Sequence, residues 1–169
     1  ATGVLPVMVG RAVKASEYLT AEDKGYIAEM RLGIVTDTGD ITGVEISRNQ
    51  AIPSAESVRN AALGFLGSIK QTPPMYSALK VGGKKLCDLA RRGEVVEREA
   101  RPVTVYSINA RRINDREYYL DVTCSKGTYI RTLCADIGAK LVVLDPLQAF
   151  LGARVDMHRA NDVRPKMKH

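Results

Sequence analysis

The segment Cys124–Thr132 brings a lysine, a tyrosine and an arginine together at the expected start of a helix. It reads C-S-K-G-T-Y-I-R-T, and Gly127 allows an unusual backbone turn between a strand and that helix. Free N–H groups at a helix N-terminus suit phosphate or carboxylate, and Lys126 adds positive charge there. Arg131 could hold a carboxylate through two N–H groups, and Tyr129 could stack on a base or hydrogen-bond to it. The alternative, which spacing alone favours, is a solvated helix start with an ordinary surface arginine.

A second candidate is Tyr26, which follows D-K-G at Asp23–Gly25 and opens an expected strand. Aromatic residues in strands usually belong to the core, so one interpretation is a packed tyrosine with its hydroxyl at the edge. The functional interpretation is a platform on which an extruded base stacks.

The third candidate is the segment Pro73–Lys80, P-P-M-Y-S-A-L-K, with Lys84 and Lys85 close behind it. Its two prolines make the beginning of the segment rigid, and the residues after them are expected to be extended. It is either a hairpin that contacts phosphate groups or a loop with solvated lysines, which runs of charge usually are.

Hydrophobic periodicity and breaker residues predict the elements that would position these side chains. Helices and strands mix along the chain, which predicts an α+β fold with a mixed, mainly antiparallel sheet flanked by helices. Ser54 is the expected N-cap of the second helix. Strands are expected at 26–32, 76–81, 103–113 and 118–124, and helices at 12–19, 54–66, 85–92 and 128–141.

Composition narrows the class of function only coarsely. The chain has 169 residues and a net charge of +6, which weakly favours a polyanionic partner such as nucleic acid. Its three cysteines form no C-x-x-C pair, and its two histidines fit no metal-ligand pattern, so we expect no metal and a cytoplasmic location. It has no apolar run of roughly 20 residues that would span a membrane. No glycine-rich nucleotide loop, H-E-x-x-H or G-x-S-x-G motif is present.

Six motifs in order resemble those of the TruB family of tRNA pseudouridine synthases. The resemblance covers roughly residues 1–141, and six ordered motifs make it specific. They are A-T-G-V-L-P at Ala1–Pro6, D-K-G-Y at Asp23–Tyr26, R-L-G-I-V-T-D-T-G-D at Arg31–Asp40, P-P-M-Y-S-A-L-K at Pro73–Lys80, G-K-K-L at Gly83–Leu86, and C-S-K-G-T-Y-I-R-T at Cys124–Thr132, which D-I-G at Asp136–Gly138 follows.

The resemblance implies an isomerase that converts uridine-55 in the T loop of tRNA to pseudouridine without a cofactor. The family detaches the base, turns it and rejoins it through carbon, and the base must first leave the stack. Its nucleophile is the aspartate of G-x-L-D-P-x-A-T-G-V-L-P. Since this chain begins at the second half of that motif, we expect the aspartate to precede Ala1.

The resemblance also assigns roles to four residues. Tyr26 matches the tyrosine that stacks on the target base and is proposed to help move a proton. Arg131 matches the arginine that pairs with the nucleophilic aspartate and would keep it charged. Tyr129 matches a residue that lines the uridine pocket, and Lys126 would attract phosphate. Tyr26 and Arg131 are therefore the expected catalytic residues, and Tyr26, Tyr129 and Lys126 the expected substrate-binding residues.

The C-terminal end departs from the family pattern. The family continues after D-I-G into an L-R-R-type motif, whereas here Leu141 runs directly into Val142. We expect a catalytic core at 1–141 without its nucleophile motif. The segment 142–169 would be an extension, either discontinuous with the core or a remnant of an RNA-binding region. Asp145, in L-D-P-L, imitates the catalytic motif but lies at the wrong end, so we do not expect it to be the nucleophile.

Three hypotheses follow for the protein as a whole. The first is a stand-alone, monomeric synthase that acts on the T arm of tRNA without a protein partner or a membrane. The second is the guide-RNA-dependent relative, which shares much of this core. The third is an RNA-binding or RNA-folding module without catalysis.

Overall fold

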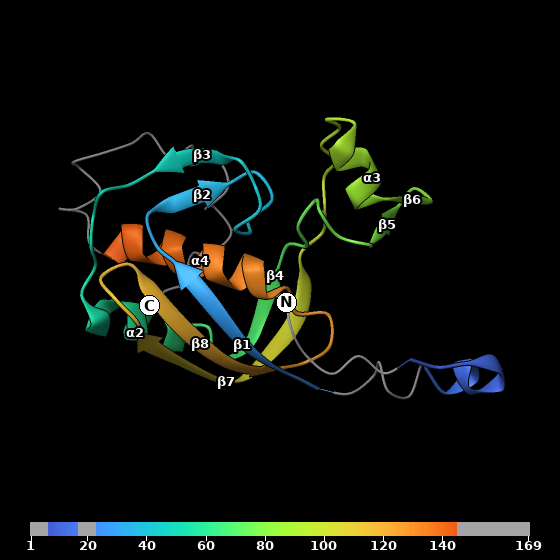
Figure 1. Cartoon of the computed structure of the whole chain (residues 1–169), viewed down its shortest axis with the longest axis horizontal. Helices are drawn as coiled ribbons and strands as arrows, with labels where there is room; N and C mark the ends of the chain where they lie inside the picture. The colour runs from blue at the N-terminus through green and yellow to red at the C-terminus, as the bar shows by residue number, and fades with distance from the viewer. Residues whose placement is uncertain (1–6, 17–22, 145–169) are drawn as a thin grey trace, which may run out of the picture.

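In the computed structural model, which describes residues 7–16 and 23–144, the central element is a four-stranded antiparallel sheet (Figure 1). Its spatial order is β1-β8-β7-β4. The strands are β1 (Lys24–Arg31), β4 (Gly67–Gln71), β7 (Arg101–Arg112) and β8 (Glu117–Cys124). The α+β class is confirmed, and every strand pair in the described residues is antiparallel.

The core lies between this sheet and two helices, α2 (Ala55–Leu63) and α4 (Ile130–Leu144), which Figure 1 shows along one face. Alternate residues of β8 are buried, as expected for a sheet with one covered face. They meet Leu133, Ile137 and Leu141, which recur at helical spacing on α4. The sheet and α2 contribute the rest of the core, chiefly Met30, Val58, Ala61, Ala62, Val105, Ile108, Ala110, Tyr118, Leu120, Val122 and Cys124.

Three smaller pieces complete the described chain. A hairpin of β2 (Ile34–Thr36) and β3 (Glu45–Arg48) lies above α4, on the side away from the sheet (Figure 1). A protruding unit contains β5 (Lys80–Val81), β6 (Lys84–Lys85) and α3 (Leu86–Arg91). The 3-10 helix η1 (Gly10–Ala15) contributes no buried residue.

Strong periodicity predicted the long elements well. The strands expected at 26–32, 103–113 and 118–124 are confirmed as β1, β7 and β8, and the helices at 85–92 and 128–141 as α3 and α4. Ser54 is the N-cap of α2, and its hydroxyl accepts a hydrogen bond from the Ser57 N–H at 3.0 Å.

Short elements were predicted less well. The strand expected at 76–81 is wrong for Tyr76–Leu79, where the backbone folds on itself because the Ser77 N–H donates to the Met75 carbonyl. Strands β2, β3, β4 and β6 were missed. The helix expected at 54–66 ends at Leu63, and the one expected at 12–19 is a 3-10 helix from Gly10 in its described part.

The expected division of the chain stays a prediction. The boundary between residues 141 and 142 falls inside α4, which continues to Leu144. Asp145 and the segment 145–169 lie outside the described residues.

Candidate functional site

The turn between β8 and α4 is pinned to the sheet by its own polar groups. The Ser125 N–H donates to the Thr104 carbonyl at 2.8 Å, and the Ser125 hydroxyl accepts from the Thr104 N–H at 2.9 Å. The Thr128 hydroxyl donates back to the Ser125 carbonyl at 2.8 Å. Gly127 has a φ of 83°, a conformation that L side chains rarely adopt. This turn carries Lys126, which is exposed, and leads into α4.

Arg131 lies in the first turn of α4 and reaches two other segments. Its Nη1 donates to Asp40 Oδ2 at 3.1 Å and to the Thr38 carbonyl at 3.4 Å, and its Nη2 donates to the Tyr76 carbonyl. Nε takes no part in these contacts. Its side chain is 31% exposed, so the guanidinium is anchored yet open to solvent. It is therefore not the ordinary surface arginine of the alternative interpretation.

Asp40 is the carboxylate partner that sequence reasoning missed. Its Oδ1 accepts from the Thr42 N–H at 3.0 Å, the Thr42 hydroxyl at 2.7 Å and the Thr38 hydroxyl at 3.1 Å. The hydrogen bonds from Thr42, with a smaller contribution from the charge of Arg131, lower the pKa of Asp40 below its ordinary value. The carboxylate is thus held charged, with both oxygens occupied.

Loop chemistry explains how Asp40 is aimed at Arg131. The loop from Thr36 to Val44 is closed by Asp37, whose Oδ1 accepts from the Val44 N–H at 2.8 Å. Gly39 has a φ of 71°, and a Cβ there would lie 3.8 Å from Cδ of Arg131. Asp and Thr side chains hydrogen-bond nearby backbone groups in such turns, and Gly adopts the positive φ, so the D-T-G-D composition was the available signal.

Tyr26 lies at the same end of the sheet as the β8–α4 turn. It pairs with Val122 of β8, two residues before Cys124, where β8 ends. Val122 is buried, so the alternation of the strands places Tyr26 on the face that the helices cover. Its 42% exposure shows that it is not a packed core tyrosine.

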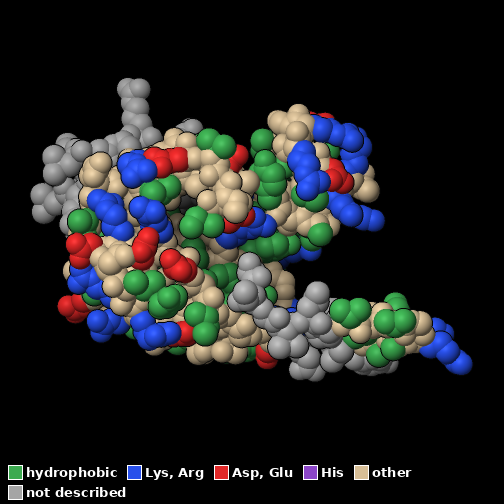
Figure 2. Space-filling view, in the orientation of Figure 1, with side chains coloured by type: hydrophobic (Ala, Val, Ile, Leu, Met, Phe, Trp, Pro, Cys, Tyr) green, Lys and Arg blue, Asp and Glu red, His purple; other side chains and the backbone are tan. Residues whose placement is uncertain are grey.

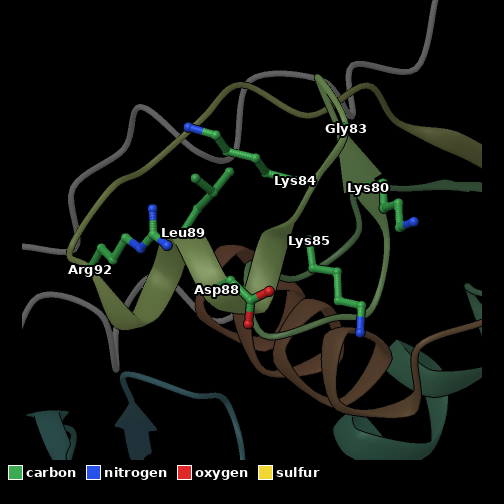
Figure 3. A pocket seen from close by; sticks show the side chains of 7 residues that line it. All are labelled: Lys80, Gly83, Lys84, Lys85, Asp88, Leu89 and Arg92. Atoms are coloured by element: carbon green, nitrogen blue, oxygen red, sulfur yellow. The ribbon is translucent and has the colours of Figure 1, made fainter.

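The protruding unit holds a basic pocket of about 370 Å³ (Figure 3). Four cations and one carboxylate line it, and Figure 3 shows the basic side chains spread around its rim. Figure 2 shows Lys and Arg side chains gathered on this unit. Leu86 and Leu89 of α3, in the same unit, are buried. The lining residues are Lys80, Gly83, Lys84, Lys85, Asp88, Leu89 and Arg92.

Two cysteines of the core are unsuited to nucleophilic catalysis. Burial raises the pKa of Cys134 to about 11, and it also raises the pKa of Cys124. Both therefore stay protonated near neutral pH, and the thiolate is the reactive form.

Within residues 7–16 and 23–144, no cluster of His, Cys, Asp and Glu side chains could hold a metal ion. The same part of the chain contains no helix that is long and apolar enough to cross a membrane.

Comparison with known proteins gives a consistent result. A family model described as TruB family pseudouridylate synthase, N-terminal domain, matches residues 1–130. Over 141 residues the chain is 50% identical to tRNA pseudouridine synthase B of Alkaliphilus oremlandii, covering 83% of this chain and 47% of the relative. It is also 50% identical over 141 residues to tRNA pseudouridine synthase B of Clostridium novyi, covering 83% and 49%. The chain thus spans about half the length of these curated relatives.

A solved structure shares the fold. It is a chain of the crystal structure of a Cbf5-Nop10-Gar1 complex, with a TM-score of 0.54 and 29% identity. The match covers 82% of this chain and 32% of that one.

Proposed function

This chain belongs to the TruB family of pseudouridylate synthases, and we propose that its protein isomerises uridine-55 in the T loop of tRNA to pseudouridine. The observation that carries the proposal is the anchored guanidinium of Arg131 at the β8–α4 turn, within a chain 50% identical to proteins named tRNA pseudouridine synthase B. The protein works without a cofactor or a protein partner, as a monomer in the cytoplasm.

Arg131 serves this reaction as the electrostatic partner of an aspartate nucleophile. The nucleophile belongs to the motif whose second half is A-T-G-V-L-P at Ala1–Pro6, outside the described residues. A guanidinium has five N–H donors, and Asp40 and the two carbonyl oxygens leave the Nε donor and one Nη2 donor for a second carboxylate. A carboxylate beside this cation stays ionised, as a nucleophile must.

The other three residues contact the RNA. Lys126, exposed on the turn, attracts phosphate, and Tyr129 lines the uridine pocket. Tyr26 offers an exposed ring at the end of β1, on which the extruded base stacks. Its hydroxyl helps to move a proton during the isomerisation.

Replacing Tyr26 separates these two functions of its ring and hydroxyl. Tyr26→Phe keeps the ring and loses the hydroxyl, so tRNA affinity should be unchanged while the single-turnover rate falls about 100-fold, within the range for a lost proton donor or acceptor. Tyr26→Leu should weaken tRNA binding as well, because the stacking surface is lost. A normal rate for Tyr26→Phe would refute the role of the hydroxyl in proton transfer.

The basic pocket of the protruding unit binds the phosphate backbone of the tRNA. Reversing two charges, Lys84→Glu and Lys85→Glu, should weaken tRNA binding at least about tenfold at low salt. The slope of log affinity against log salt concentration is negative, and its magnitude should decrease by about two, because two phosphate contacts no longer release counterions. Filter binding at several salt concentrations measures both values. The matched control is Arg111→Glu with Arg112→Glu at the far end of β7; an equal loss there would refute a specific role for the pocket.

The structural similarity to a chain of the Cbf5-Nop10-Gar1 complex favours one alternative, a synthase that depends on guide RNA and protein partners. Incubating the full-length protein with unmodified tRNA transcript, followed by chemical mapping of pseudouridine, decides between them. Pseudouridine at uridine-55 without guide RNA or partner is the expected result. Salt-sensitive binding without any pseudouridine would favour the guide-dependent or the non-catalytic hypothesis.

A further inference from the structure

Gln71, the last residue of β4, makes a two-point contact with the segment that precedes α4. Its Oε1 accepts from the Tyr129 N–H at 2.7 Å, and its Nε2 donates to the Tyr129 carbonyl at 3.1 Å. Gln71 is only 2% exposed. The side-chain amide therefore satisfies both backbone polar groups of one residue in a place that water hardly reaches.

Tyr129, the residue that Gln71 holds, directly precedes α4, the helix that carries Arg131. The Tyr129 carbonyl also accepts the N–H of Leu133 at 3.0 Å, the i to i+4 bond with which helical hydrogen bonding begins. Arg131 follows two residues later, in the first turn of α4. Any shift of the Tyr129 backbone therefore moves the Cα atom from which the guanidinium projects.

The segment that follows Gln71 returns to contact the same guanidinium. Pro73 and Pro74 stiffen it, and the Arg98 Nη1 donates to the Pro73 carbonyl at 2.9 Å. The Tyr76 carbonyl then accepts from Nη2 of Arg131. One short segment thus fixes both ends of the arginine, its backbone origin through Gln71 and its charged tip through Tyr76.

We propose that Gln71 is a positioning residue for catalysis, which aims Arg131 by holding the backbone of Tyr129. The inference rests on the proposed function, because it assigns Gln71 a part in the same reaction. Glutamine suits the position because one planar amide presents an acceptor and a donor together. Asparagine is one methylene shorter, and glutamate would place a carboxylate against the Tyr129 carbonyl.

The test uses the full-length protein with Gln71→Met, which fills similar space without hydrogen bonds. The single-turnover rate of pseudouridine formation should fall about 100-fold, the cost of a misplaced catalytic group, while tRNA affinity is unchanged. Asn114→Ala is the matched control, because the Asn114 amide also makes two hydrogen bonds to backbone groups, in its case accepting from two N–H groups in the turn between β7 and β8. It should leave the rate unchanged.

A double-mutant cycle distinguishes positioning from loss of fold. If Gln71 acts through Arg131, Gln71→Met should lower the rate no further once Arg131 is alanine. A full additional loss in that background would overturn the proposal, as would a normal rate for Gln71→Met alone. Should Gln71→Met fail to fold, Gln71→Asn keeps a neutral amide that is one methylene too short to make both contacts with Tyr129, and the same cycle applies.

Hydrogen exchange tests the contact between Gln71 and Tyr129 independently of turnover. Hydrogen exchange at the Tyr129 amide should be slow in the wild type and faster by at least about tenfold in Gln71→Met. A wild type without pseudouridine would defeat the proposed function but not this structural step. Unchanged exchange at Tyr129 in the variant would overturn the positioning role in either case.

Discussion

Arg131→Ala should lower the single-turnover rate of pseudouridine formation by at least about 1,000-fold, equivalent to about 4 kcal/mol. The substitution removes the cation that Asp40 and the carbonyl oxygens of Thr38 and Tyr76 hold in place. The proposed nucleophilic carboxylate would lose its counter-charge, and Asp40 would become an unpaired negative charge nearby. Affinity for tRNA should change by less than about threefold, because the lysines proposed to bind phosphate are untouched. A quenched-flow assay with excess enzyme, together with filter binding, measures the two quantities separately.

Two further variants identify what the arginine provides. Arg131→Lys keeps the charge but cannot make the same set of contacts, so it should recover only a small part of the rate. Arg111→Ala is the matched control, because Arg111 also pairs with an aspartate, Asp121, at 2.8 Å on β7 and β8. Near-normal turnover in Arg131→Ala, or a comparable loss in Arg111→Ala, would contradict the assigned role.

The parts of the fold that sequence predicted are those in which one residue type repeats with the period of the element. Strand β8 alternates buried and more accessible positions throughout, β7 does so over much of its length, and α4 repeats Leu133, Ile137 and Leu141. Strand β4 gave no such signal. It is a five-residue edge strand that begins at a glycine, and its pairing with β7 joins residues far apart in the chain.

The candidate site was predicted in part for the same reason. Lys126, Tyr129 and Arg131 could be grouped because they lie within six residues of one another in the sequence. Asp40 could not, because its hydrogen bond to Arg131 spans 91 residues. Gln71 was equally hidden, since its partner Tyr129 is 58 residues away. Local composition predicts a turn, but only the tertiary fold decides which side chain that turn delivers to a distant helix.

These contacts make the site a junction of three segments. The β8–α4 turn supplies the arginine, the loop between β2 and β3 supplies Asp40, and the segment after β4 supplies the Tyr76 carbonyl. Each Nη atom of the guanidinium therefore donates to at least one acceptor that is fixed in the fold. Such preorganisation matters because a charge that is already oriented needs no rearrangement when the transition state forms.

Asp40→Asn should therefore slow pseudouridine formation about 100-fold, although Asp40 touches Arg131 rather than the proposed substrate. The amide oxygen can still accept from Thr42 and Thr38 and so keep the loop, but its NH₂ group then faces Nη1 of Arg131. Donor opposes donor, and the guanidinium loses a charge-assisted hydrogen bond that fixes its direction. The single-turnover rate of the full-length protein, with filter binding for tRNA affinity, measures the effect.

The pH dependence of this variant provides an independent check. Hydrogen bonds from Thr42, with the charge of Arg131, hold the pKa of Asp40 below its ordinary value. The wild-type carboxylate therefore stays ionised from about pH 6 to about pH 9, and the ratio of wild-type to Asp40→Asn rates should be constant over that range. Asp121→Asn, which disrupts the pair with Arg111, is the control and should turn over normally. Two outcomes would show that Asp40 acts otherwise than by holding the arginine. One is a ratio that approaches one as the pH falls. The other is an effect of Asp40→Asn that is just as large when Arg131 is already alanine.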